Sequence, residues 1–357
     1  MPLITEKRAD SRGSATMWEQ VPARLAERPT TPTNCIKIAL VNNMPDAALE
    51  DTELQFSELI HAASGEVPVH IELYSLPGIR RGRRGQERLN EFYSGIDGLW
   101  DNRIDCAIIT GTEPHEADLR DERYWPVMTK LFDWAEQNTF SAVLSCLAAH
   151  ASVLHGDGVV RQAQAEKLFG VFQERKIREH SLTEQIGSAL QVPHSRWNDI
   201  QESDLASHGY EVLTRSIEAG AGLFVKKKGK SLFVHFQGHP EYGVRALLKE
   251  YRRDIGRYLR RERQSYPDLP RGYFGTDATK ILTDFRSGAL SRQGEGAMRG
   301  FPEVDVTKSL QNAWRTSAVL VYRNWLQYVS SRKAETTAVA SIARTERNSW
   351  SNSAGAV

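Results

Sequence analysis

Four apolar runs of strand length alternate with helical patterns in the first half of the chain. The first, third and fourth runs are nearly continuous in apolar residues, as expected for strands that are buried on both faces. The runs are "CIKIALVNN" (35–43), "VPVHIELYSL" (67–76), "IDCAIITG" (104–111) and "FSAVLSC" (140–146). Parallel strands joined by helices explain this alternation. We therefore expect an α/β fold with a mostly parallel sheet and helices on both faces.

The rest of the chain continues this pattern and suggests the domain limits. Further strands are expected at "EKLFGVFQ", "YEVLTRS", "AGLFVKK" and "KSLFVHFQ". Residues 1–33 are polar and proline-containing, which predicts a flexible N-terminal arm before a single domain at 34–330. Within that domain, 264–312 is rich in Gly, Pro, Ser and Asp, which favours an extended, partly ordered connection. Residues 331–357 are polar and predict a disordered C-terminal tail.

Composition excludes several classes of protein. The formal net charge is +1, which predicts no nucleic-acid partner,. No run approaches the ~20 apolar residues of a membrane span, so we expect no membrane association. The three cysteines are scattered and none forms a C-x-x-C pair, which favours the cytoplasm and predicts no disulfide framework and no metal site,.

Cys146 stands where the fourth strand ends and a helix of small residues, "LAAHAS", begins. A side chain on such a strand-to-helix turn is held out from the sheet, as in the nucleophile elbow of α/β hydrolases. The N–H groups of the following helix point toward it, which activates a thiol and can stabilise an oxyanion. Cys146 is therefore a candidate nucleophile, and the alternative is a buried cysteine at a strand end.

The run "FVHFQGHPEY" (233–242) ends on a candidate base. In an extended segment His239 and Glu241 would point to the same side, held by the stiff Pro240 between them. An imidazole beside a carboxylate can deprotonate a thiol and then a second substrate. Because sites in open parallel sheets form beyond the carboxyl ends of the strands, we expect His239 and Cys146 to meet there. The alternative is a surface histidine beside a chance glutamate.

A cysteine after the fourth strand, followed by "HPE" at the end of a late strand, resembles the class I glutamine amidotransferase fold. More specifically, residues 35–330 resemble the homoserine O-acyltransferase (homoserine O-succinyltransferase) family of methionine biosynthesis. Several motifs occur in the family's order: "IALVNNMPDAALEDTELQFSELI", "AIITGTEP", "YWPVMTKLFDWAEQN", "AEKLFGVF", "VPHSRW", "SIEAGAGLF", "GHPEY", "EYRRD", "GYF" and "AWRTSAVLVYRNWLQYV".

The resemblance implies roles for individual residues. Cys146 would accept the acyl group, with His239 as base and Glu241 as its orienting acid. The positions expected to contact substrate are Lys167, Ser195 and Arg253. Arg253 suits the α-carboxylate of an amino acid, because guanidinium and carboxylate pair through two parallel hydrogen bonds.

The family reaction would need backbone donors for an oxyanion, which we assign to the N–H groups of Leu147 and Thr112. His115 stands at the position that helps to set the length of the acyl group. The substrates would be acyl-CoA, as a co-substrate, and homoserine, with no bound cofactor. The sequence does not determine the oligomeric state, and a homodimer is one alternative.

The chain departs from the family in ways that leave alternatives open. Leu147 and Ala148 replace a usual Trp and small residue after the nucleophile, and His115 replaces a usual Gly or Glu. The 264–312 stretch is longer than usual. Acetyl instead of succinyl transfer, or serine instead of homoserine as acceptor, would use the same triad. A glutaminase and a non-catalytic binding protein with an amidotransferase fold are further alternatives.

Overall fold

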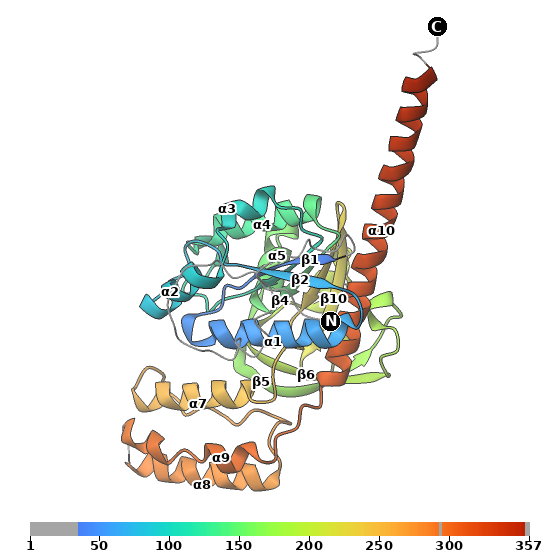
Figure 1. Ribbon diagram of the computed structural model, residues 1–357. Helices are drawn as coiled ribbons and strands as arrows, with labels where there is room; N and C mark the ends of the chain where they lie inside the picture. The colour runs from blue at the N-terminus through green and yellow to red at the C-terminus, as the bar shows by residue number, and fades with distance from the viewer. Residues whose placement is uncertain (1–34, 293–294, 354–357) are drawn as a thin grey trace.

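A seven-stranded sheet forms the centre of the computed structural model, which describes residues 35–292 and 295–353 (Figure 1). The strand order is β2-β1-β3-β4-β11-β10-β7; the first five strands are parallel, and β10 is antiparallel to both its neighbours. The strands are β1 (Ile36–Val41), β2 (Val69–Tyr74), β3 (Cys106–Thr110), β4 (Ser141–Ser145), β7 (Glu211–Val212), β10 (Leu223–Lys228) and β11 (Ser231–Phe236). The arm predicted at 1–33 lies outside the described residues.

Helices cover both faces of this sheet. On one face, Ile36, Ile38 and Leu40 of β1 pack in the same cluster as α1 (Asp46–Ser64) and α10 (Arg315–Ser353). Ala39 and Val41 point to the other face, because successive side chains of a strand alternate,. That face is covered by α4 (Trp125–Asn138) and α5 (Leu147–Asp157). The fold class predicted from the sequence is confirmed.

A second, antiparallel sheet has the order β6-β5-β8-β9. Its long strands β5 and β6 pair over most of their length, and β5 contributes Phe169 and Val171 to the same cluster as α7 (Ala246–Leu259). The predicted strand "YEVLTRS" is divided, because its first half forms β7 of the central sheet and its second half forms β8 of this one. The strands are β5 (Gln162–Lys176), β6 (Ala189–Asp199), β8 (Thr214–Ser216) and β9 (Gly220–Ala221).

A helical layer lies below the sheets in Figure 1 and contains much of the predicted extended connection. It comprises α7 (Ala246–Leu259), α8 (Thr276–Arg292), the 3-10 helix η4 (Glu295–Gly300) and α9 (Glu303–Thr307). The expectation of an extended 264–312 segment is thus wrong for its helical part. α8 buries only a narrow stripe, Ala278, Leu282 and Ala289. A stripe this thin in a Ser- and Thr-rich helix leaves little apolar periodicity in the sequence.

The C-terminal helix α10 also differs from the expectation of a disordered tail from residue 331. Its first half packs Val321, Trp325 and Val329 into the core, and the helix then continues away from the body (Figure 1). Extending a helix that is already nucleated costs far less than starting one, so a polar sequence can remain helical there. The remaining helices are α2 (Arg83–Phe92), α3 (Ile96–Asp101), α6 (Glu202–Ser207), η2 (Leu119–Asp121) and η3 (Ser181–Thr183). Among the residues described, no helix is long and apolar enough to cross a membrane.

Candidate active site

Cys146 occupies a sharp turn between β4 and α5. Its φ of 51° and ψ of −108° lie outside the regions that non-glycine residues usually adopt,. It directly precedes Leu147, the first residue of α5, and its side chain is neither fully buried nor fully exposed. The turn thus has the strand-to-helix geometry that the sequence predicted for a nucleophile, including the backbone strain that such sites commonly store.

The strand that precedes the candidate base lies directly beside β4. In the parallel pairing of the two strands, Phe236 of β11 is opposite Ser145 of β4. The next residue continues the ladder, because the Cys146 N–H donates to the Phe236 carbonyl oxygen at 2.8 Å. His239 follows three residues after Phe236, so the thiol and the imidazole start from the same edge of the same pair of strands.

His239 and Glu241 form a buried pair. His239 Nδ1 lies 2.9 Å from Glu241 Oε1, and the same oxygen accepts a hydrogen bond from Ser145 Oγ at 3.0 Å. The sequence predicted an extended segment here, but the backbone turns, with the Tyr242 N–H donating to the His239 carbonyl at 3.1 Å. The two side chains still meet because the turn, rather than strand alternation, brings them together.

The surroundings of His239 favour its protonated form. Burial by itself would lower its pKa, but charge interactions and hydrogen bonds with Cys146 and Glu241 outweigh burial and raise the pKa of His239 well above its usual value,. Because Nδ1 is occupied by Glu241, Nε2 is the ring nitrogen available to the thiol. A thiol, an imidazole and a carboxylate therefore interact in series, which is the arrangement needed for nucleophilic catalysis.

The turn that bears His239 is anchored from two sides. The His239 N–H donates to the Pro193 carbonyl of β6 at 2.7 Å, and Trp314 Nε1 donates to the Tyr242 carbonyl at 2.7 Å. Tyr242 also stacks on the imidazole, with ring centroids 4.2 Å apart. These contacts fix the imidazole before substrate arrives, which is what a positioned base requires.

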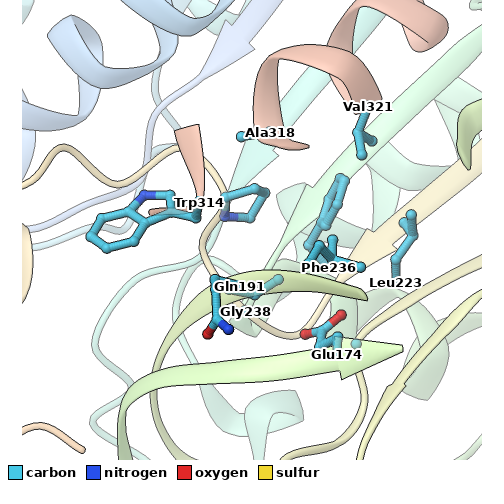
Figure 2. Close-up of a pocket in the computed structure, with 12 residues that line it drawn as sticks. Glu174, Gln191, Leu223, Phe236, Gly238, Trp314, Ala318 and Val321 are labelled. Carbon is cyan, nitrogen blue, oxygen red and sulfur yellow. The ribbon is translucent and has the colours of Figure 1, made fainter. Parts of the chain in front are cut away.

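Behind this turn lies a small pocket that Figure 2 shows between Trp314, Phe236 and Glu174. Its volume is about 10 Å³, which is space for a single water molecule at most,. The Glu174 carboxylate is already engaged, with His194 Nε2 at 3.0 Å and Thr214 Oγ1 at 2.5 Å. This pocket is therefore part of the packing beneath the base and has no room for a substrate.

The candidate oxyanion donors lie on two neighbouring segments. Leu147 is the first residue of α5, where backbone N–H groups have no acceptor within the helix,. Thr112 follows Gly111 at the end of β3, the strand next to β4. The two segments approach closely: a Cβ added to Gly111 would lie 2.4 Å from Leu147 Cβ and 3.1 Å from Leu147 N. Glycine at 111 therefore allows the contact that brings both donors toward Cys146.

The three residues expected to contact substrate converge on α7. Lys167 Nζ lies 3.3 Å from Glu250 Oε2 and 3.2 Å from Asp254 Oδ2. Ser195 Oγ donates to Glu250 Oε2 at 2.5 Å, and Arg253 lies 3.4 Å from the same oxygen. Burial acts to raise the pKa of Glu250, but Lys167, Arg253 and further hydrogen bonds together lower it to about 2. The result is a charged polar cluster beside the base.

Sequence reasoning missed two members of this cluster. Glu250 and Asp254 are four positions apart on α7, so they share one face of the helix,. Tyr242 was also missed, and it joins the cluster to the base because its hydroxyl donates to Glu250 Oε1 at 2.7 Å while its ring covers His239. The sequence did contain features that could have identified these residues: Tyr242 directly follows Glu241 in "HPEY", and Glu250 and Asp254 are spaced by four within a helical pattern.

His115, the expected acyl-specificity residue, lies on the wall of a larger cavity. The cavity has a volume of about 190 Å³ and is also lined by Thr112, Glu122 and Tyr124. Glu122 is buried and accepts hydrogen bonds from the N–H of His115 at 2.5 Å and of Glu116 at 2.8 Å. No group of His, Cys, Asp and Glu side chains in the described parts of the chain could hold a metal ion.

Comparisons with known proteins agree on one family. The family model for homoserine O-succinyltransferase matches residues 21–336. The homoserine O-succinyltransferase of Rhodopseudomonas palustris is 43% identical over 296 residues, covering 83% of this chain and 89% of that protein. The enzyme of the same name from Bradyrhizobium japonicum is 43% identical, with 83% and 90% covered.

Solved structures with a similar backbone include two glutamine amidotransferases. The protein from Thermotoga maritima has a TM-score of 0.44 and 9% identity, covering 82% of this chain and 98% of that one. The protein from Methylobacillus flagellatus has a TM-score of 0.45 and 12% identity, covering 83% and 95%.

Proposed function

The chain belongs to the homoserine O-succinyltransferase family, and we propose that it transfers a succinyl group from succinyl-CoA to the hydroxyl of homoserine through a thioester on Cys146. The observation that carries this mechanism is the pairing of β4 with β11, which brings Cys146 beside the buried His239–Glu241 pair. The cytoplasm is the proposed compartment, since the chemistry needs a reduced thiol and the cysteines of the described residues are free,.

In the first half-reaction, His239 holds the proton of the Cys146 thiol, and the thiolate Sγ attacks the thioester carbonyl,. The N–H groups of Leu147 and Thr112 stabilise the oxyanion of the tetrahedral intermediate. The intermediate then collapses, the bond to the CoA sulfur breaks, and the proton on His239 leaves with CoA as its thiol. The product is succinyl-Cys146 with a neutral His239, because the proton has left with CoA and the thiolate charge is gone.

In the second half-reaction, His239 takes the proton of the homoserine hydroxyl, and that oxygen attacks the succinyl carbonyl. The same backbone donors stabilise the second oxyanion. Collapse breaks the bond to Cys146 Sγ, which recovers its proton from His239, and the succinyl ester of homoserine leaves. Glu241 keeps the imidazole oriented and stabilises its charged form throughout.

The cluster on α7 supports an amino-acid acceptor. Arg253 and Lys167 offer cationic groups to an α-carboxylate, and Glu250 offers an anionic group to an α-ammonium,. Because Tyr242 joins Glu250 to His239, an amino acid held there would have its side-chain hydroxyl near the base. Comparing the rates with homoserine and with serine tests which acceptor fits.

The decisive experiment is mass spectrometry of the intact protein after incubation with succinyl-CoA alone. We expect one succinyl adduct on Cys146 in the wild type, loss of the adduct on adding homoserine, and ping-pong kinetics. Cys146→Ala should give no adduct and lose nearly all activity. Cys35→Ala is the matched control. Cys35 is buried and directly precedes β1, so it lies at the amino ends of the parallel strands, whereas Cys146 lies at their carboxyl ends. An active Cys146→Ala variant, or an adduct on another residue, would refute the mechanism.

A further inference from the structure

Thr110 is a buried residue of β3 whose hydroxyl the proposed mechanism does not yet use. It is the last residue of the strand and lies opposite Ser145, which directly precedes Cys146. Its side chain is shielded from solvent, since the residue is only 1% exposed. A hydroxyl at this depth is costly unless it is hydrogen-bonded, so its partners indicate its role.

The Thr110 hydroxyl links two backbone groups. It accepts a hydrogen bond from the Asn43 N–H at 2.8 Å and donates one to the Gly111 carbonyl oxygen at 3.1 Å. The Asn43 side chain is also buried, and it donates to the Thr110 carbonyl at 2.9 Å and accepts from the Leu76 N–H at 3.0 Å. The segments that follow β1 and β2 are thereby tied to the end of β3, and such a satisfied buried network is rigid.

The Gly111 carbonyl belongs to the same peptide unit as the N–H of Thr112, a candidate oxyanion donor. In a planar trans peptide the C=O and N–H groups point in opposite directions,. A hydrogen bond that fixes the Gly111 carbonyl therefore also fixes the direction of the Thr112 N–H. The same bond draws electron density toward the carbonyl oxygen and makes the N–H a stronger donor, because hydrogen bonds in a chain polarise one another.

The Thr112 N–H is not used by the fold. Within residues 35–292 and 295–353, it donates to no backbone acceptor. Thr112 also lines the cavity of about 190 Å³, so its segment borders space that a substrate can enter. The preceding Gly111 lies against Leu147, which bears the second candidate donor. An unengaged N–H beside a cavity and next to the turn of the nucleophile suits an oxyanion donor.

We propose that Thr110 is a positioning residue that orients and polarises the Thr112 N–H for the tetrahedral intermediates of acyl transfer. This inference rests on the proposed function of Cys146. Thr110 itself does not touch the substrate. Its hydroxyl holds the peptide unit in place before the oxyanion forms, so that no reorganisation is needed at the moment of reaction. Donors that are fixed in advance in this way stabilise developing charge most effectively.

The test compares two reactions of Cys146 in Thr110→Val, which has a side chain of similar shape without the hydroxyl. Acylation by succinyl-CoA forms an oxyanion, whereas alkylation by iodoacetamide is a direct displacement that forms none. We expect the rate of succinyl-Cys146 formation to fall roughly ten- to hundredfold, since complete loss of an oxyanion donor costs about 10²–10³. The KM for succinyl-CoA and the alkylation rate should change by about threefold or less. Thr110→Ser should restore most of the acylation rate, because it restores the hydroxyl.

Thr139→Val is the matched control. Thr139 is also buried, and its hydroxyl also donates to a backbone carbonyl, that of Ala135 at 2.8 Å. It precedes β4, however, and so lies at the amino ends of the parallel strands, away from Cys146. Both variants should be less stable in urea, whereas only Thr110→Val should lose acylation. Thr110→Ala lacks the same hydroxyl and replaces Thr110→Val if that variant does not fold.

Two results would overturn the role of Thr110. One is acylation at the wild-type rate in a folded variant that lacks the hydroxyl, and the other is an equal loss of acylation and alkylation. If the wild type forms the succinyl adduct and either result is found, only the inference about Thr110 fails. If the wild type forms no adduct, the thioester mechanism itself fails.

Discussion

Replacing Gly111 with alanine should damage catalysis without touching a reacting group. The added Cβ would lie 2.4 Å from Leu147 Cβ, whereas carbon atoms in ordinary contact are ~3.5–4.0 Å apart,. Leu147 is the first residue of α5 and Thr112 follows Gly111, so the two candidate oxyanion donors must separate by about 1 Å to relieve the overlap. The contact involves Leu147 Cα and N as well, at 3.1 Å each, so a side-chain rotation cannot remove it.

The size of the effect follows from what such a displacement costs. A misplacement of about 1 Å in a catalytic site lowers rates by roughly a hundredfold, and loss of one oxyanion donor costs about 10²–10³ in kcat. We therefore expect kcat/KM of Gly111→Ala to fall by about 10²-fold or more. The free energy of unfolding should fall by about 1–3 kcal/mol, the usual cost of overpacking.

The assay measures the rate of thioester formation on Cys146 in a single turnover, together with urea unfolding to show that the variant is folded. Gly98→Ala is the matched control, because no heavy atom lies within 4 Å of a Cβ added at that position in α3. It should keep the wild-type rate. A folded Gly111→Ala variant that forms the thioester as fast as wild type would refute the assignment of these donors.

Two further predictions concern charge. Glu241→Gln keeps a hydrogen-bond acceptor but removes the anion, so the pKa of His239 should fall and kcat/KM should drop by roughly 10²–10⁴-fold,; an unchanged histidine titration by NMR would contradict this. Burial lowers the pKa of three other histidines to about 3 or 4, below the ~6.5 of the unfolded chain. They are His150, His194 and His235. Unfolding takes up protons at each of these three below pH ~6.5, so their contribution to stability should be complete above that pH and should fall by up to ~1.4 kcal/mol per pH unit for each histidine as the pH drops toward 5. Urea unfolding at a series of pH values measures this slope. His235→Gln should reduce the slope by about one proton,. A free energy of unfolding that does not change between pH ~6.5 and ~5 would contradict the prediction.

Much of the candidate site could be anticipated because its parts are local in the chain. Cys146 follows an apolar run and precedes small helix-forming residues, and this pattern by itself predicts the strand-to-helix turn. His239 and Glu241 are two positions apart, so almost any backbone path brings them close. The predicted secondary structure was least accurate in segments with few apolar residues at helical spacing, such as α8 and the second half of α10.

The sequence by itself determined the strands of the parallel sheet and the residues at their carboxyl ends, because burial on both faces demands continuous apolar runs that can be read directly. Only the tertiary structure decided that β11 lies beside β4 and that Glu250 and Asp254 gather Lys167, Ser195 and Arg253. The physical reason is the separation in sequence over which each interaction acts. Strand and turn preferences depend on near neighbours in the chain, whereas strand order and ion pairing depend on groups that are far apart in the sequence and that only the packed core brings together.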